Sequence, residues 1–221
     1  MSYEAVCFDL DNTLYAAESD LFGLIDVRIN AYMRDVVGIE PVRVDYLRRH
    51  YWEKYGVTLR GLMHEYGTDA EHYLEYVHDV DVSSRLKPDP ELKFCLQEMP
   101  ERRFVFTNGS SDHARRVLKC LGIEECFEHI YDIRISNYMP KPHPDPYHAA
   151  LNHAGMCGEE CVMVEDSLPN LHTASHLNMG TIWITSQSGD RFPHVDAVVP
   201  DVTRATGVIG GWRDMRAACA Q

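Results

Sequence analysis

The sequence lacks the long hydrophobic runs that mark a membrane protein, because nowhere do about 18 apolar residues follow one another. Residues 1–8 contain no basic start and only a short apolar run, so we expect no signal peptide. Repeats of fixed period and low-complexity tracts are also missing, which argues against solenoids, propellers and disordered chains. We therefore expect no membrane partner.

Positive charge is scarce, since 21 Lys and Arg residues face 34 Asp and Glu residues and leave a net charge of −13. A field of this sign repels the phosphates of a nucleic acid polymer, which we exclude as a partner. The seven cysteines are odd in number and scattered rather than set in a small secreted frame. Reduced thiols and a cytoplasmic location are the expectation. The sequence sets no oligomeric state.

Short apolar runs separated by helix-length segments dominate what is present. The runs that we predict to be strands are residues 3–8, 103–106, 161–164, 181–184 and 197–199. This alternation predicts an α/β fold, namely a Rossmann-like parallel sheet with helices on both faces.

One stretch contains helical patterns and no convincing strand. The helices that we predict there are residues 21–36, 41–55, 59–66 and a fourth that starts at residue 68. Thr68 and Glu71 have the spacing of a reciprocal capping box. We therefore predict an all-helical cap domain, residues 17–86, inserted into a core domain of residues 1–16 and 87–221. Such a block usually lies over the carboxyl ends of the strands, where open parallel sheets bind ligands.

The sharpest motif is Asp9-Leu10-Asp11-Asn12-Thr13, directly after the first strand. Two carboxylates beyond a strand end can reach one reaction centre. One can attack phosphorus while the other protonates the leaving group and later deprotonates water. The alternative is an Asx-rich turn, in which Asp11 and Asn12 only bond nearby backbone.

Two further segments offer groups that suit a phosphate, and the first of them follows a predicted strand. Thr107-Asn108-Gly109 supplies a hydroxyl, an amide and an unobstructed backbone ahead of a helix N-terminus. Lys141 is flanked by Pro140 and Pro142, which stiffen the backbone and could aim its ammonium group. The alternatives are an ordinary strand-to-helix loop and an exposed structural lysine.

Acidic residues also end a buried strand, at Glu165-Asp166. Such carboxylates need a cation as their complement. A phosphate dianion approaching Asp9, Asp11 and Asp166 likewise needs a countercharge. Mg²⁺ with oxygen ligands, together with Lys141, would supply it.

With these motifs the sequence resembles the haloacid dehalogenase superfamily, in four motifs that follow in the right order between about residues 6 and 185. The resemblance implies Asp9 as the nucleophile that forms an aspartyl phosphate and Asp11 as the general acid and base. It implies that Thr107 holds phosphate oxygens and that Lys141 neutralises the nucleophile and the phosphate.

The resemblance also implies a Mg²⁺ site, in which Asp166 binds the ion with Asp9 and the carbonyl group of Asp11. Glu165 joins the metal shell or the shell behind it. The sequence departs from many members of the superfamily at Asn170, where they carry another acid. A water-mediated metal contact is expected to be weaker there.

Asp11 also discriminates within the superfamily, because dehalogenase and phosphonatase members lack an acid at that place. The resemblance therefore points to phosphate esters. The helical insertion directly after the first motif matches the first cap class of the superfamily.

A narrower resemblance is to the pyrimidine 5′-nucleotidase group, which dephosphorylates nucleoside monophosphates such as UMP and CMP. The segments that carry it are residues 55–56, 59–62, 86–89, 107–109, 113–118 and 121–122. It implies a small phosphorylated metabolite, a nucleoside monophosphate, as the partner. Asn108 and Gly109 are candidate substrate-binding residues. Arg60 is a candidate cap residue that reaches substrate, since a guanidinium can stack on a base; a solvated helix residue is its alternative.

The sequence therefore predicts a Mg²⁺-dependent phosphomonoester hydrolase, most specifically a pyrimidine nucleoside 5′-monophosphate phosphatase. A phosphatase or phosphomutase for sugar phosphates or another small metabolite is the alternative among enzymes. A non-catalytic binding protein that retains the fold is the alternative of another class.

Overall fold

Each apolar run that the sequence predicts as a strand forms one. The computed structural model describes residues 3–186 and 192–219. The strands are β1 (Ala5–Phe8), β2 (Arg102–Phe106), β3 (His129–Tyr131), β4 (Cys161–Glu165), β5 (Gly180–Ile184) and β6 (Ala197–Val199). They make one parallel sheet in the order β3-β2-β1-β4-β5-β6. Strand β3 was not predicted, because three residues at a sheet edge, of which His129 is exposed, give no apolar run.

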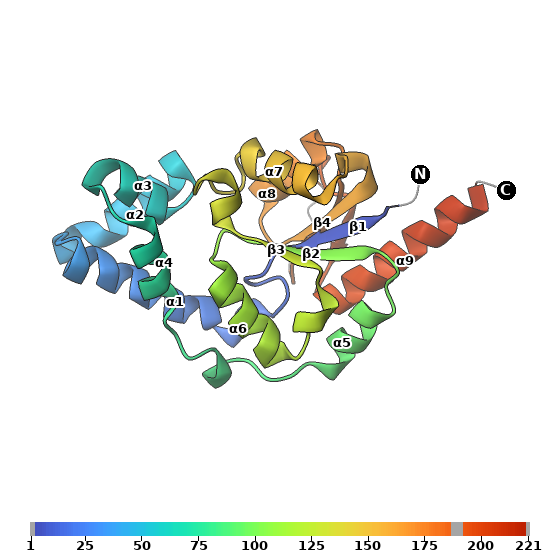
Figure 1. Ribbon diagram of the computed structural model, residues 1–221, viewed down its shortest axis with the longest axis horizontal. Helices are drawn as coiled ribbons and strands as arrows, with labels where there is room; N and C mark the ends of the chain where they lie inside the picture. Colours follow the sequence, from blue (N-terminus) through green and yellow to red (C-terminus); the bar gives the residue numbers. More distant parts are fainter. Residues whose placement is uncertain (1–2, 187–191, 220–221) are drawn as a thin grey trace.

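Helices cover both faces of this sheet, as predicted. Alternate residues of each strand point to opposite faces, so Val6 and Phe8 join one apolar cluster while Ala5 and Cys7 join the other. The first cluster packs against α5 (Pro90–Gln97), α6 (Ser111–Leu121) and α9 (Val202–Cys219), and the second against α7 (Pro144–Ala154) and α8 (Leu168–His176). Figure 1 shows these two layers below and above the strands. The C-terminal segment is helical as far as Cys219.

Short turns of helix connect the longer elements. They are Ala17–Ser19, Val82–Ser84, Glu124–Cys126, Ile133–Ser136 and Gly158–Glu160, with a wider π-helical turn at Tyr32–Val36. None of the helices within residues 3–186 and 192–219 is both long and apolar enough to cross a membrane.

Four helices lie between β1 and α5 and form the inserted block. They are α1 (Leu21–Ala31), α2 (Pro41–Tyr55), α3 (Thr58–Tyr66) and α4 (Ala70–His78). Apolar side chains of the block, Tyr32, Tyr51, Leu62 and Tyr73 among them, make a third cluster apart from the two that line the sheet. Figure 1 shows the block at one end of the molecule, beyond the carboxyl ends of the strands. We call it the cap. The domain boundaries at residues 16/17 and 86/87 stay a prediction.

The capping box predicted at Thr68 is wrong. Helix α4 begins at Ala70, and its N-cap is Asp69, whose carboxylate accepts a hydrogen bond from the N–H of His72 at 2.7 Å. Aspartate is among the best N-cap residues, and the Glu71 carboxylate is occupied elsewhere. It accepts hydrogen bonds from Arg134 at 2.8 and 2.6 Å.

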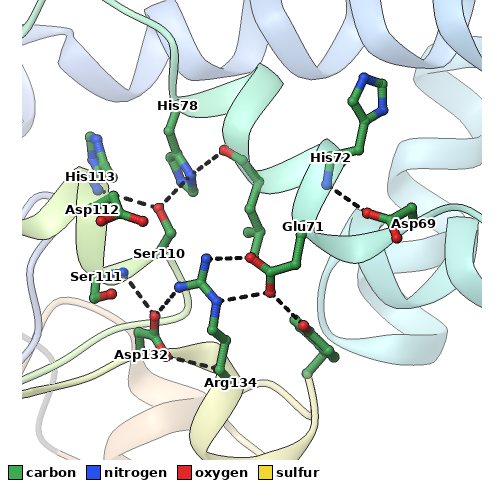
Figure 2. Close-up of polar contacts among 12 residues, drawn as sticks. Asp69, Glu71, His72, His78, Ser110, Ser111, Asp112, His113, Asp132 and Arg134 are labelled. Carbon is green, nitrogen blue, oxygen red and sulfur yellow. Dashed lines mark hydrogen bonds and ion pairs between the residues drawn. The ribbon is translucent and has the colours of Figure 1, made fainter.

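Arg134 thereby joins the cap to the core, as Figure 2 shows. Its guanidinium also pairs with Asp132, which follows β3, and Asp132 in turn accepts a hydrogen bond from the N–H of Ser111 at 2.8 Å. The hydroxyl of Tyr138 donates to Glu71 as well. The start of α4, the segment after β3 and the start of α6 are therefore linked through one arginine.

Glu71→Gln is expected to lower the free energy of unfolding at pH 7 by about 0.5–1 kcal/mol, the range of a half-exposed ion pair. Hydrogen bonds from Arg134 and then Tyr138 lower the pKa of Glu71 to about 2. Because the folded-state pKa is depressed, this stability is present above the unfolded pKa of Glu, about 4.3, and is lost as the pH falls towards 2. Urea unfolding at pH 7 and at pH 3 checks this: the difference between variant and wild type should shrink at pH 3, and an equal difference at both values would contradict it.

Candidate active site

The carboxyl ends of β1, β2 and β4 lie level with one another, so the segments that follow them meet at one edge. Phe8 is in register with Val105 of β2 and Val164 of β4. The sheet pattern continues for one residue, because the N–H of Asp9 donates to the carbonyl oxygen of Val164 at 2.9 Å. The predicted motifs, distant in sequence, are brought to the same place by this register.

Lys141 is buried beneath this edge, with 1% of its side chain exposed. Its Nζ donates to Oδ1 of Asp9 at 2.8 Å, to Oε2 of Glu165 at 2.8 Å and to the carbonyl oxygen of Phe106 at 2.6 Å. An ammonium group has three N–H donors, and each has an acceptor. Burial alone would lower the pKa of Lys141, but the charges of Asp9 and Glu165 outweigh it and raise the pKa above its ordinary value. The alternative of an exposed structural lysine is wrong.

The segment that carries Lys141 is fastened by Asn108. The N–H of Lys141 donates to Oδ1 of Asn108 at 2.8 Å, and Nδ2 of Asn108 donates to the carbonyl oxygen of Lys141 at 3.0 Å. Asn108 is a predicted substrate-binding residue. Its side chain instead faces the backbone of Lys141 and holds that segment against the end of β2, while the residue still lines the cavities described below.

Three carboxylates gather next to the lysine. Asp9, Glu165 and Asp166 offer oxygen atoms that all lie within 4.8 Å of one another. Burial, with the charge of Glu165 added, raises the pKa of Asp9 to about 7 although Lys141 opposes the shift. Burial also raises the pKa of Glu165 to about 7 and, together with the charge of Asp9, raises that of Asp166. A group of oxygen ligands whose charges repel each other fits a divalent cation such as Mg²⁺.

Glu165 differs from the other two carboxylates in its partners. Besides Lys141, the N–H of Ser167 reaches its Oε1 at 3.2 Å and Nδ2 of Asn170 reaches its Oε2 at 3.0 Å. Asn170 therefore stands where the sequence resemblance leads one to expect an acid, and its amide supports Glu165. Glu165 has the geometry of a residue that fixes Lys141 while lying beside Asp9 and Asp166, whose oxygens could hold a metal ion.

Asp11 lies on a tight turn that follows Asp9. Asn12 adopts the left-handed conformation, with φ of 62°, which asparagine tolerates better than most residues. The carboxylate of Asp11 does not bond nearby backbone, as the turn alternative required. Its Oδ1 accepts hydrogen bonds from the hydroxyl of Tyr15 at 2.5 Å and from Nε2 of His113 at 3.2 Å.

Burial alone would raise the pKa of Asp11, but His113, followed by Tyr15, outweighs it and lowers the pKa below its ordinary value. The ring of His113 stacks on that of His78, at the end of α4, with centroids 4.6 Å apart and planes 14° apart. Burial lowers the pKa of His78 to about 3, with the neighbouring His113 acting in the same direction.

The contacts of Tyr15, His78 and His113 were missed from the sequence. Tyr15 lies four residues after Asp11, a spacing of about one helical turn, and this spacing could have indicated that the two side chains meet. His113 begins one of the segments of the narrower resemblance, but nothing in the sequence indicated its contact with Asp11.

Two connected cavities open onto this edge. The catalytic cavity, about 960 Å³, is lined by the predicted residues Asp9, Asp11, Thr107, Lys141, Glu165, Asp166 and Arg60. The cap chamber, about 440 Å³, lies between cap and core. Asp11 lines both. The hydroxyl of Thr107 accepts the N–H of Gly109 at 2.9 Å, and Gly109 faces the cap chamber.

The cap touches the Lys141 segment at Gly56. A Cβ atom at this position would lie 2.9 Å from Cγ of Pro140, and the φ of +84° is one that L side chains rarely adopt. Only glycine allows the turn after α2 to pass this close to the segment.

All predicted site residues lie around the two cavities, including Arg60 from α3.

The family model for haloacid dehalogenase-like hydrolases matches residues 3–177 of this sequence. Among curated proteins, the chain is 26% identical over 190 residues to phosphate metabolism protein 8 of Saccharomyces cerevisiae, covering 79% of this chain and 59% of the yeast protein. It is also 26% identical over 200 residues to a phosphoglycolate phosphatase of Colwellia psychrerythraea, covering 82% of this chain and 84% of that protein. The chain therefore spans less than two thirds of the yeast relative.

Among solved structures, the fold is similar to that of a phosphatase from Thermococcus onnurineus, with a TM-score of 0.65 and 20% identity. The match covers 96% of this chain and 100% of that one. At this identity the likeness shows a common fold.

Proposed function

The chain belongs to the haloacid dehalogenase-like hydrolase family, and from that premise we propose that it is a Mg²⁺-dependent phosphomonoester hydrolase specific for pyrimidine nucleoside 5′-monophosphates. The observation that carries the proposal is the contact of Asp9 with the buried ammonium of Lys141 at 2.8 Å, beside a second carboxylate, Asp11, which lines both cavities.

In this proposal the reaction has two steps. A carboxylate oxygen of Asp9 attacks phosphorus, the bond from phosphorus to the ester oxygen breaks, and Asp11 gives its proton to the leaving alcohol. Asp11 then takes a proton from water, which attacks phosphorus and breaks the bond to Asp9. Phosphate leaves and the free carboxylate of Asp9 returns.

The other residues serve these steps by position and charge. Lys141 keeps Asp9 in place and offsets negative charge, and Thr107 lies where it can hold a phosphate oxygen. Asp9, Asp166 and the carbonyl group of Asp11 would hold Mg²⁺, which supplies positive charge to the phosphoryl oxygens when bound. The clustered carboxylate oxygens support this assignment.

The cap chamber supports a nucleoside as the leaving group. Its walls are mainly apolar: Phe22, Ile25, Ile29, Trp52, Val57, Leu59, Leu74, Val77 and Ile133. A volume of about 440 Å³ is in the range of small-molecule sites. Hexose hydroxyls would lose their hydrogen bonds to water against such walls, whereas a flat base would be accommodated. Arg49 lines the same chamber and can donate to base oxygens, whereas the guanidinium of Arg48, also in the wall, pairs with Asp26.

A second candidate is a phosphatase for another small acid or sugar phosphate. The relative named phosphoglycolate phosphatase and the position of Arg60 in the catalytic cavity favour it, because a guanidinium suits a substrate with a second anionic group. A non-catalytic protein that keeps the fold is less well supported, since each motif position carries a group competent for the chemistry.

A panel of phosphate esters, with and without Mg²⁺, tests the proposal. We expect UMP and CMP to give kcat/KM values at least about tenfold above those of hexose phosphates and phosphoglycolate, because burial of the base in an apolar chamber contributes about 1–3 kcal/mol of discrimination. Phosphate release should fall to background when EDTA replaces Mg²⁺.

Arg49→Met and Trp52→Ala serve as variants of the chamber, and Val42→Ala, on an exposed position of the same helix α2, is the control. The chamber variants should lower kcat/KM for UMP more than for a small alkyl phosphate, and the control should change neither. A preference for hexose phosphates or phosphoglycolate would reject the substrate assignment. If no ester of the panel released phosphate in the presence of Mg²⁺, the assignment as a phosphomonoester hydrolase would be rejected.

A further inference from the structure

One oxygen of Asp11 is held by two donors from different parts of the core. Tyr15, one turn further along the chain, donates its hydroxyl hydrogen to Oδ1 at 2.5 Å, and Nε2 of His113, from the first turn of α6, lies 3.2 Å from the same atom. Because the proton that Asp11 gives in the proposed reaction is on Oδ2, Oδ1 only accepts, and the hydrogen between His113 and Asp11 is assigned to Nε2. No residue within the described ranges donates a hydrogen bond to Oδ2 of Asp11.

His113 is buried and held by contacts of its backbone and of its ring. Its side chain is 0% exposed, and its own N–H donates to the hydroxyl of Ser110, the N-cap of α6, at 3.3 Å. The His78 ring stacks on its ring. Nδ1 of His78 lies 2.9 Å from the carbonyl oxygen of Leu74 and 3.1 Å from the Ser110 hydroxyl. Figure 2 shows His78 and Ser110 turned toward one another.

The ring has one polar contact through its nitrogen atoms. Nδ1 of His113 has no hydrogen-bond partner among the residues that the structure describes. A histidine buried for packing alone would be expected to have both nitrogen atoms satisfied or to be replaced by an apolar residue. Within the described residues, the one hydrogen bond of this ring is instead made to Asp11, which lines both cavities.

Resting on the proposed function, we propose that His113 is a positioning residue for the reaction: with Tyr15 it holds Oδ1 of Asp11, so that Oδ2 faces the oxygen of the leaving alcohol. Two donors on one oxygen prevent the carboxyl group from rotating about its terminal bond, which is otherwise soft. Because proton transfer requires the two oxygen atoms to approach within hydrogen-bond distance, a loss of this constraint slows the step that needs the proton.

Leaving groups of different strength separate this role from a general effect on the fold. An alkyl or nucleoside alcohol must be protonated as it leaves, whereas the p-nitrophenolate ion leaves without a proton. A residue that positions Asp11 for proton donation should therefore matter for UMP and hardly at all for p-nitrophenyl phosphate. Single-turnover measurements with enzyme in excess restrict the comparison to the first step, before water attacks.

The experiment compares His113→Leu, His113→Gln and Tyr15→Phe with wild type in the presence of Mg²⁺. His113→Leu is expected to slow the first turnover of UMP by roughly 10- to 100-fold, the usual effect of a small misplacement, and that of p-nitrophenyl phosphate by less than about threefold. KM for UMP should change by less than about twofold, since uniform binding is not altered. Tyr15→Phe should show the same selectivity.

His113→Gln is the rescue variant, because its amide nitrogen can take the place of Nε2 and donate to Asp11. It should recover most of the first-turnover rate with UMP. His153→Gln is the matched control, since His153 also contacts a side-chain oxygen, that of Tyr131, but lies on α7 away from both cavities. Thermal unfolding of each variant shows whether it is folded, and Tyr15→Phe carries the test if His113→Leu is not.

Equal losses with UMP and p-nitrophenyl phosphate would overturn the inference and leave His113 with a purely structural role. Unchanged rates with both esters would overturn it as well. In either case an active wild-type protein leaves the proposed function standing. A wild-type protein that releases phosphate from neither ester would remove the proposed function and this inference together.

Discussion

Asp9→Asn is expected to reduce phosphate release by roughly 10⁴-fold or more, since loss of the proposed attacking group removes the covalent route altogether. The fold should persist, because the amide oxygen of asparagine can still accept the hydrogen bond that Lys141 gives to Oδ1. Burial and the charge of Glu165 raise the pKa of Asp9 to about 7. The neutral amide removes this buried charge, so the free energy of unfolding at pH 8 without Mg²⁺ should not fall.

Steady-state release of phosphate from UMP measures the activity, and urea unfolding measures the stability. Acid quenching during turnover adds a direct test, because wild type should be trapped with one phosphoryl group on the peptide that contains Asp9. Asp69→Asn is the control: asparagine is an equally good N-cap, so turnover and stability should both stay near wild type. Turnover by Asp9→Asn at the wild-type rate would remove the nucleophile assignment.

Lys141→Met is expected to lower turnover by about 10³-fold, because a preorganised positive group at the reacting carboxylate is lost. Stability should fall too, by about 3 kcal/mol, the usual effect of removing one partner of a buried ion pair. The loss should depend on pH. Asp9 and Glu165 have pKa values raised to about 7 by burial even with Lys141 present.

A carboxyl group with a raised folded-state pKa favours the folded protein at low pH, and this contribution disappears as the pH rises through the folded-state value. Without Lys141 both groups are protonated at pH 5 and need no countercharge. The free energy of unfolding of the variant should therefore be close to that of wild type at pH 5 and well below it at pH 8. Urea unfolding without Mg²⁺ at both values tests this. Lys93→Met, which removes a surface pair with Glu125, is the control and should have little effect. An equal loss of stability at pH 5 and pH 8 would contradict the argument.

The architecture could be predicted because its signals are local. Compact apolar runs marked five of the six strands, and spacings of three and four with Gly56 and Pro41 at the ends marked the helices of the cap. Strand β3 was not predicted because it is short and lies at an edge of the sheet. There, pairing with β2 rather than its own composition makes it a strand. The error at Thr68 has a similar origin: Asp69 was the better cap, and Arg134, 63 residues away, competed for Glu71.

The site was predictable to the extent that strand ends determine it. Asp9, Thr107 and Glu165 each end or follow a strand, and a parallel sheet brings such positions together. What the sequence could not show are the partners chosen in three dimensions: the amide of Asn108 on the backbone of Lys141, and the ring of His113 on Asp11. These contacts join positions 33 and 102 residues apart, and no spacing rule connects them.

The cap carries an apolar interior of its own, apart from those that stabilise the sheet. Substitutions that reshape the wall facing the ester's organic part are therefore absorbed within the four inserted helices and need not disturb the strands. In evolution, the substrate specificity of such a protein can therefore change while the residues at the strand ends stay the same.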